Sequence, residues 1–157
     1  MRSAMVPLML DTLLPLVTEW VEVQQAHILR HGVPLSNHRA FDAHLAGVKN
    51  PGAVRLLKAD SIPMPTPPAL ARANELVGLV SPLTAGITFG HGIYIRDDCW
   101  DDRPLIVHEL VHVAQYEHYG SVATFLTAYL DECLTFGYPN GPLAREAIVR
   151  STEICRT

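Results

Sequence analysis

Residues 105–116 read LIVHELVHVAQY, an apolar run that contains the pattern HExxH. In an α-helix, positions four apart lie one above the other on one face, so the rings of His108 and His112 can meet at one point in space. Zinc binds neutral imidazole well, and a catalytic zinc has three protein ligands and an open position for water. Glu109 lies beside the pair and can take a proton from that water. The stretch predicts a buried helix that carries two ligands of a zinc site; the alternative is a buried helix with two incidental histidines.

The length and composition indicate one compact globular domain. The chain has 157 residues, of which 48% are hydrophobic and 18% are charged, a balance typical of folded and not of disordered proteins. We expect a single domain over 1–157, with N-terminal helices in 1–50 and a core in 54–155. The net charge of −4 and the lack of a basic cluster argue against nucleic acid as a partner.

The cysteines and the N-terminus bear on the compartment in which the protein works. Cys99, Cys133 and Cys155 form no C-x-x-C pair and cannot all pair with one another, so we expect free thiols in a reducing environment. The apolar residues at the N-terminus are interrupted by Asp11, and no small-residue cleavage site follows. No run approaches the roughly 20 apolar residues that span a bilayer. These features predict a cytoplasmic protein with no membrane partner.

Capping residues and apolar periodicity predict the elements around the motif. Thr12 can cap a first helix that keeps Pro15 in its first turn and ends at Gly32. Asp101 or Asp102 can cap the motif helix, which ends at Gly120; capping is favoured over a calcium loop, because the spacing and glycine of such a loop are missing. Further elements are expected as helices at 36–46, 68–77, 122–135 and 142–154, a strand at 54–60 and an extended proline-rich connector at 61–68.

A β-hairpin is expected beside the motif helix. Residues 85–89 and 93–96 alternate in character around Gly90-His91-Gly92. The alternation predicts that one face of the hairpin packs on the motif helix through Ile87, Phe89, Ile93 and Ile95. Its outer edge would then be free to pair with an extended peptide.

A catalytic site needs a third ligand, for which three residues compete. Glu146 lies on the last predicted helix, and a carboxylate from a neighbouring antiparallel helix completes the known His2Glu set. His118 has the spacing of the pattern HExxHxxGxxH. However, Gln115 replaces the glycine that turns the chain there, and a continuous helix would carry His118 about 9 Å beyond His112 along its axis. Glu153, two turns beyond Glu146, is the third candidate.

Five features follow one another along the chain: the hairpin at 85–96, a short acidic loop, the HELVHVAQY segment, the pair Gly137-Tyr138, and Pro-Leu-x-x-Glu-Ala at 142–147. Together they resemble the minigluzincins, small single-domain members of the thermolysin-like gluzincins, over roughly residues 54–155. The resemblance implies an α+β class: a mainly helical, zincin-like domain with a small antiparallel sheet beside the HExxH helix. The chain departs from the family's Pro-Leu-Glu-x-Glu-Ala at Ala144, so Glu146 is the only carboxylate of this motif.

These features predict a zinc metallopeptidase that acts on a peptide or protein, with zinc bound by His108, His112 and Glu146. Glu109 would be the general base. An oxyanion needs a donor beyond zinc; Tyr138 is the first candidate and His91 the second.

The alternative function is a zinc-stabilised binding or regulatory domain without turnover. In such a domain the thiolate of Cys133 would fill the fourth position on the metal. The presence of Glu109 favours the enzyme, because a purely structural zinc site needs no base.

Overall fold

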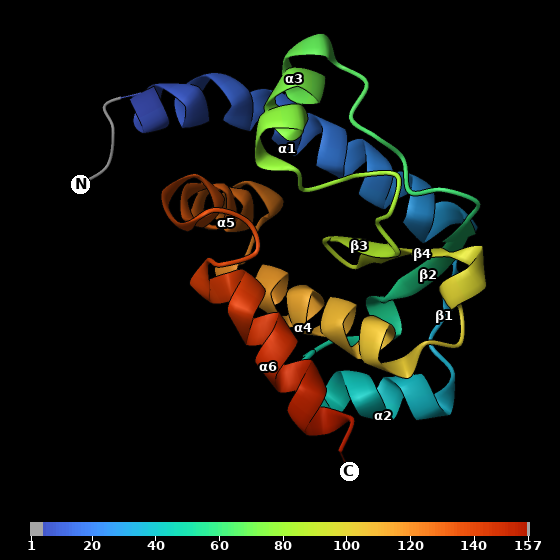
Figure 1. The fold of residues 1–157 in the computed structure, drawn as a ribbon. Coiled ribbons are helices and arrows are strands. Elements are labelled where there is room, and N and C mark those ends of the chain that lie inside the picture. The colour runs from blue at the N-terminus through green and yellow to red at the C-terminus, as the bar shows by residue number, and fades with distance from the viewer. Residues whose placement is uncertain (1–4, 157) are drawn as a thin grey trace.

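The computed structural model describes residues 5–156, with side chains from residue 10 onward. These residues form an α+β fold, as expected (Figure 1). In chain order the elements are α1 (Met5–His31), β1 (Val33–Pro34), α2 (Asn37–Leu45), η1 (Pro51–Ala53), β2 (Arg55–Ala59), α3 (Pro68–Val77), β3 (Gly86–Phe89), β4 (Gly92–Arg96), η2 (Asp97–Cys99), α4 (Arg103–Tyr119), α5 (Val122–Phe136) and α6 (Pro142–Ile154).

Local capping chemistry explains where most helices begin and end. Ser36 caps α2 by accepting from the backbone N–H of Arg39, and Asp102 caps α4 by accepting from that of Leu105. Gly120 ends α4 with a φ of 83°, a left-handed conformation that glycine adopts without strain. The predicted bounds of α3 and α6 are confirmed, and α5 extends one residue further than expected.

The first helix differs from its prediction. It is helical from Met5, so Thr12 is not its N-cap and Pro15 lies in its interior. An interior proline removes one backbone hydrogen bond and crowds the preceding turn. Here helix-forming residues, many of them Leu, Met or Val, continue on both sides of it and carry the helix through. Residues 1–4 belong to the N-terminal segment in which no cleavable leader is expected, and they lie outside the described residues.

The sheet is mixed, which corrects the expected small antiparallel sheet. Its strand order is β1-β2-β4-β3; β2 and β4 run parallel, and the two outer pairs are antiparallel. The connection that contains α3 returns to the end of the sheet where β2 finished, so β3 runs opposite to β2. The hairpin then turns β4 back into the space between them, and β3 becomes an edge strand.

The hairpin is confirmed, but its predicted face is wrong. Phe89 pairs with Gly92, so the turn has only two residues, Gly90 and His91. With this register Ile87 pairs with Tyr94, and Thr88 pairs with Ile93. Because side chains alternate across a strand, Ile87 and Phe89 lie on the opposite face of the sheet from Ile93 and Ile95.

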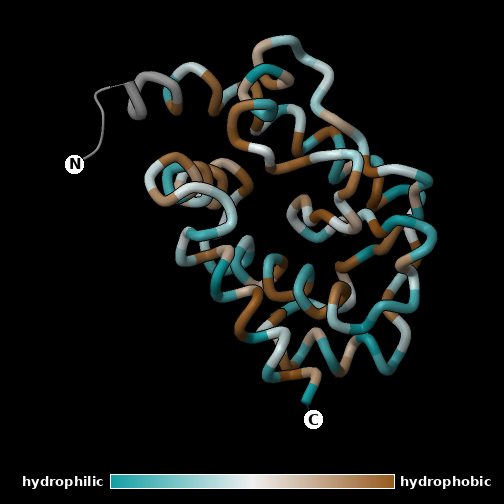
Figure 2. The backbone as a smooth tube through the Cα atoms, viewed as in Figure 1, coloured by the Kyte–Doolittle hydropathy of each residue, from teal (hydrophilic) through white to brown (hydrophobic). Residues whose placement is uncertain are grey.

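Each face of the sheet is covered by helices. Ile93 and Ile95 pack with Ile106 and Leu110 of α4 in one core cluster. Ile87, Phe89 and Tyr94 pack in a second cluster with side chains from α1 and α5. Figure 2 shows hydrophobic segments of α1, α5 and the strands turned toward the interior, with hydrophilic loops outside. Within residues 5–156 no helix is long and apolar enough to cross a membrane.

Candidate functional site

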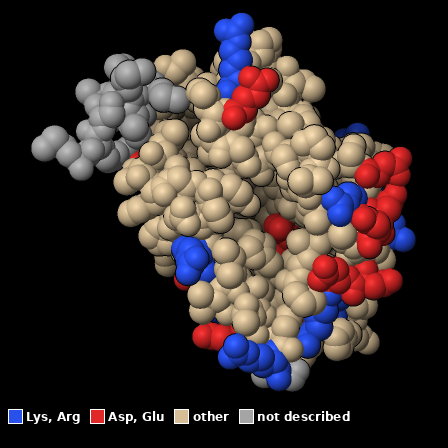
Figure 3. All heavy atoms as spheres, viewed as in Figure 1, with Lys and Arg blue, Asp and Glu red and all other residues tan. Residues whose placement is uncertain are grey.

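A cavity of about 190 Å³ lies between α1, α3, β3, α4, α5 and the segment that follows α5. His108, Glu109 and His112 of α4 form its polar end. Among the lining residues that the structure describes, Glu109 is the one acidic residue. Figure 3 shows a hollow with an acidic group at its base, bordered largely by uncharged residues. The motif that the sequence singles out therefore opens into a cavity.

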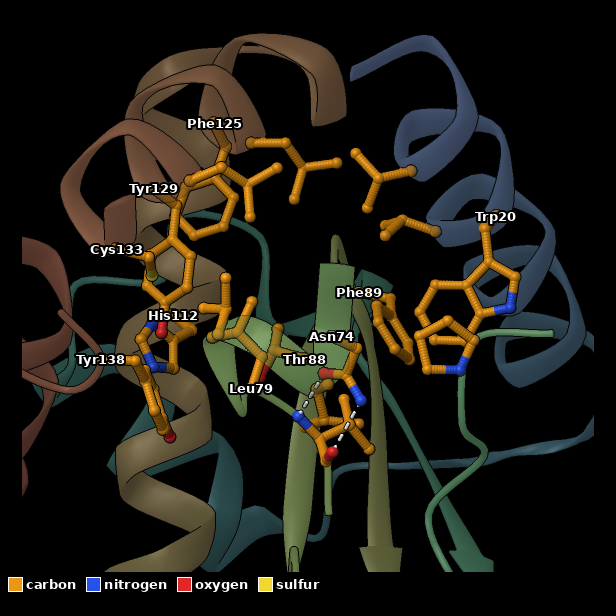
Figure 4. A pocket seen from close by; sticks show the side chains of 18 of the residues that line it. Trp20, Asn74, Leu79, Thr88, Phe89, His112, Phe125, Tyr129, Cys133 and Tyr138 are labelled. Atoms are coloured by element: carbon orange, nitrogen blue, oxygen red, sulfur yellow. Dashed lines mark hydrogen bonds between the residues drawn. The ribbon is translucent and has the colours of Figure 1, made fainter. Parts of the chain in front are cut away.

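The two motif histidines are brought together as expected. They lie one turn apart on α4, their ring centroids are 5.0 Å apart, and both line the cavity. His112 is buried, whereas His108 is half-buried. The rings of His112 and of Tyr129 on α5 pack edge to face, with their centroids 5.8 Å apart (Figure 4). One face of α4 thus presents two imidazoles to the same space.

Gln115 determines which nitrogen of His112 is free. The Nε2 of Gln115 donates to the backbone oxygen of Leu143 and to Glu146 Oε1, each at 3.0 Å. Its amide oxygen must then face His112 Nδ1, which lies 2.8 Å away. An amide oxygen only accepts hydrogen bonds, so Nδ1 carries the proton and Nε2 of His112 keeps its lone pair.

Glu109 is positioned by the edge strand. Its side chain is 5% exposed, and Thr88 Oγ1 of β3 donates to its Oε2 at 2.6 Å. The Thr88 hydroxyl also lies 3.0 Å from the backbone oxygen of Glu109. Gly86 lets β3 approach α4 here, because a Cβ at this position would lie 3.4 Å from Glu109 Cγ and 3.2–3.3 Å from two other side chains. The register of β3 therefore places Thr88 and Gly86 against the side chain of Glu109.

Glu146 lies on α6 and connects to the histidine pair through Gln115. Its side chain is exposed, and Gln115 Nε2 is its hydrogen-bond donor. Within the described residues, no three side chains of His, Cys, Asp or Glu are gathered closely enough to hold a metal ion. The role of Glu146 as third ligand stays a prediction.

The other proposed ligands lie elsewhere. His118 is exposed on α4, which continues as a helix to Tyr119, so the chain does not turn after the motif. Glu153 is exposed near the end of α6. Neither residue lines the cavity, and neither does Glu146; what distinguishes Glu146 is its hydrogen bond from Gln115, which also contacts His112.

The two candidate oxyanion donors are separated. Tyr138 lines the cavity beside the histidine end (Figure 4). His91 does not; its Nε2 lies 2.9 Å from Glu117 Oε2, at the other end of α4. Cys133 lines the cavity as a free thiol, and Cys99 and Cys155 are also free.

Burial controls the protonation states of the site. It lowers the pKa of His112, although the negative charges of Glu109 and Glu146 act in the opposite direction. Burial raises the pKa of Tyr138, and the charge of Glu109 adds to this effect. Burial also raises the pKa of Cys133 to about 12. The site therefore favours a neutral imidazole, a protonated phenol and a protonated thiol near pH 7.

Three side chains that contact the motif residues were not identified from the sequence. Thr88 contacts Glu109 through the strand register, which the alternation pattern alone did not fix. Tyr129 is one of many apolar positions of α5. Gln115 entered the sequence analysis only as the residue that replaces the turning glycine; its place one turn after His112 on the same face could have indicated the contact.

Comparison of the chain with family models, curated proteins and solved structures found no match. The geometry of the site and the sequence motifs therefore carry the functional argument.

Proposed function

We propose that this protein is a zinc-dependent metallopeptidase of the small gluzincin type, in which His108, His112 and Glu146 bind the metal. The observation that carries the proposal is the joint position of His108, Glu109 and His112 at the polar end of one cavity, beside an edge strand. We further propose a peptide or protein as the substrate and the cytoplasm as the compartment, for which the free cysteines are the support.

The donor set is compatible with zinc. Metal binding requires neutral imidazoles, and burial favours that form of His112. Gln115 leaves Nε2 of His112 as the unprotonated nitrogen. His108 adds the second imidazole, and Glu146, tied to the same Gln115, supplies the carboxylate. When bound, zinc would supply Lewis-acid activation of a water molecule and of the scissile carbonyl.

The chain's own residues would handle the proton and the charge. Glu109 accepts the proton of the attacking water and later gives it to the leaving amine. The hydroxyl of Thr88 holds Oε2 of Glu109, so the carboxylate keeps one orientation in the cavity. The Tyr138 hydroxyl is protonated near pH 7, since its pKa is ordinarily about 10 and burial raises it further, and it can donate to the developing oxyanion.

The outer edge of β3 would align the peptide. The backbone N–H of Arg96 donates to the oxygen of Ala85, and antiparallel pairing alternates inward and outward groups. Ala85, Ile87 and Phe89 therefore bond toward β4, while Gly86 and Thr88 turn their backbone groups outward. Tyr116 contacts the Thr88 oxygen at 3.5 Å, and the remaining outward groups support addition of an extended substrate strand.

Metal content and hydrolysis of a peptide library test the proposal together. The purified protein should bind about one zinc per chain at neutral pH and cleave peptides. Glu109→Gln should keep the zinc and lose hydrolysis, because this residue moves a proton and does not bind the metal. A protein that takes up no zinc would contradict the proposal, and so would loss of zinc from Glu109→Gln.

The non-catalytic alternative has less support. Cys133 lines the same cavity, but burial and the nearby charge of Glu132 raise the pKa of its thiol to about 12. A thiolate is the form that binds metal. Replacement of Cys133 by Ser should leave zinc binding unchanged if the protein is the proposed enzyme; loss of the metal would favour the binding domain.

A further inference from the structure

The cavity is much larger than the part that faces the histidines. From His112 and Tyr138 it extends between α5 and β3 to Trp20 of α1, as the labelled side chains in Figure 4 show. Beyond its polar end, its lining contains no Lys, Arg, Asp, Glu or His side chain within the described residues. The walls are built from Leu, Val, Ile, Phe and Trp of four separate elements.

Two polar side chains along this apolar part, Asn74 and Thr88, already make hydrogen bonds within the protein. Asn74 donates through Nδ2 to the backbone oxygen of Val80 and accepts from its N–H through Oδ1, at 2.8 and 2.9 Å (Figure 4). The hydroxyl of Thr88 donates to Glu109. A ligand that enters this part would therefore find mainly hydrocarbon walls, because both side chains are already held by hydrogen bonds within the protein.

Away from the edge of β3, a peptide backbone cannot enter such a space at low cost. Burial of an amide without a hydrogen-bond partner costs about 2–7 kcal/mol, and each residue of a backbone brings one donor and one acceptor. A hydrocarbon chain has no such groups, and each buried CH₂ is favourable. The composition of the walls thus selects hydrocarbon over backbone.

The volume indicates the length of that hydrocarbon. A cavity needs about 10–15 Å³ to hold one water-sized group, so 190 Å³ has room for at least about a dozen heavy atoms. This exceeds the side chains of Leu, Met and Phe. A chain of about ten carbons would fill the space from the histidine end to Trp20.

We infer that this cavity binds a linear acyl chain of about ten carbons, and that the substrate class is an N-acylated peptide whose amide lies at the His108–His112 end. The position of the amide rests on the proposed function, whereas binding of the chain does not. The acyl chain would fix the position of the substrate along the cavity, and the edge of β3 would hold the peptide that follows it.

The test is a chain-length series measured without turnover. N-acylglycines with four to twelve carbons are titrated into the Glu109→Gln protein. Trp20, which lines the cavity, reports by fluorescence after the second tryptophan, Trp100, has been replaced by Phe. Trp100 lies away from the cavity, with Arg39 and Lys58 about 5 Å from its ring centroid. Affinity should rise about three- to fourfold per added carbon and level off near ten carbons.

Two substitutions locate the binding. Ala73→Phe on α3 fills the cavity and should lower the affinity for N-decanoylglycine at least tenfold; the matched Ala69→Phe, on an exposed position of the same helix, should not. Leu130→Phe, which narrows the cavity from α5, should give the same loss, so the result does not depend on one variant folding.

The outcomes separate the two proposals. Affinity that is independent of chain length, or unchanged by both cavity variants, overturns the acyl-chain site. Decanoate that binds as tightly as N-decanoylglycine overturns the position of the amide. A protein that binds the chains as expected but never hydrolyses an N-decanoyl peptide with zinc present contradicts the proposed function and leaves the acyl-chain site intact.

Discussion

Gln115 joins the motif helix α4 to α6, the helix that carries the predicted third ligand. Its amide oxygen accepts from His112 Nδ1, and its amide nitrogen donates to Leu143 and Glu146 of α6. One buried side chain therefore fixes the tautomer of a histidine and the approach of a carboxylate. Such outer contacts orient a metal ligand as much as its own rotamer does.

Replacement of Gln115 by Met keeps the length of the side chain and removes its three hydrogen bonds to His112, Leu143 and Glu146. The Nδ1-protonated form of His112 should then no longer dominate, and zinc affinity should fall about 10–100-fold. Nitrogen NMR of the metal-free protein at pH 8 reports the tautomer, and a competition titration reports zinc. Gln24→Met is the matched control, since Gln24 accepts from the hydroxyl of Tyr94 away from the histidines. An unchanged tautomer in Gln115→Met would contradict this role.

Three single substitutions decide the third ligand. Glu146→Ala should lose most zinc affinity, because its carboxylate is the acidic group that Gln115 connects to His112. His118→Ala and Glu153→Ala should keep it, because the continuous helix carries His118 about 9 Å beyond His112 along its axis, and Glu153 lies two turns beyond Glu146 on α6. The measurement is zinc content after dialysis against a weak chelator. Retention by Glu146→Ala with loss in His118→Ala would assign the third ligand to α4 itself.

The elements show which signals in a sequence are local and which are not. The N-caps Ser36 and Asp102 and the stop at Gly120 are short-range features, and each was predictable from a few neighbouring residues. The start of α1 was not, because proline favours a first turn, whereas here it lies in the interior of a helix that runs on from Met5.

The wrongly predicted face of the hairpin has a cause that lies outside the hairpin sequence. A two-residue turn at Gly90-His91, in place of a three-residue one, moves Ile87 and Phe89 to the other face of the sheet. A shift of one residue in register moves every side chain of a strand to the other face of the sheet. The register is selected by the packing of α1 on one face and α4 on the other. The same register aims Thr88 at Glu109, so the missed contact and the wrong face have one cause.

The contact between α1 and β4 depends on a glycine. A Cβ at Gly92 would lie 2.9 Å from Ile28 Cβ and 3.0–3.1 Å from two further atoms of that buried side chain. Gly92→Ala should therefore lower the free energy of unfolding by about 1–3 kcal/mol, measured by urea denaturation. Gly52→Ala is the control, because its nearest neighbour would be 3.8 Å away, and its effect should stay within about 0.5 kcal/mol. Equal effects of the two substitutions would mean that α1 adjusts its position freely.

At the scale of the whole molecule, the motif helix gathers distant parts of the chain. His108 and His112 could be assigned to a site from their spacing alone, since four residues on a helix define a geometry. The position of Glu146 depends on how α5 turns and how α6 packs on α4, which no local pattern encodes. The apolar cavity is similarly invisible in the sequence, because its walls come from α1, α3, β3 and α5.

Glu117, two residues before the end of α4, is the clearest of these long-range links. Its carboxylate accepts from the backbone N–H of Lys49 at 2.7 Å and of Asn50 at 3.1 Å, and it contacts His91 in the hairpin turn at 2.9 Å. The side chain is 9% exposed. Burial alone would raise the pKa of Glu117, but the hydrogen bonds from His91 and the two backbone groups together lower it below the ordinary value of 4.5.

A lowered pKa in the folded state makes acid destabilising. Near pH 4.5 the unfolded chain binds a proton at this position more readily than the folded chain, so the contribution of Glu117 is complete above pH 4.5 and is lost as the pH falls through the folded value. Glu117→Gln removes the charged acceptor and should cost about 1–3 kcal/mol at pH 7. The difference in unfolding free energy between wild type and this variant should shrink as the pH drops below 4.5. Urea denaturation of the metal-free proteins between pH 3 and 7 measures it, with the exposed Glu153→Gln as the control. A gap that stays constant down to pH 3 would show that Glu117 contributes through its shape and not through its charge.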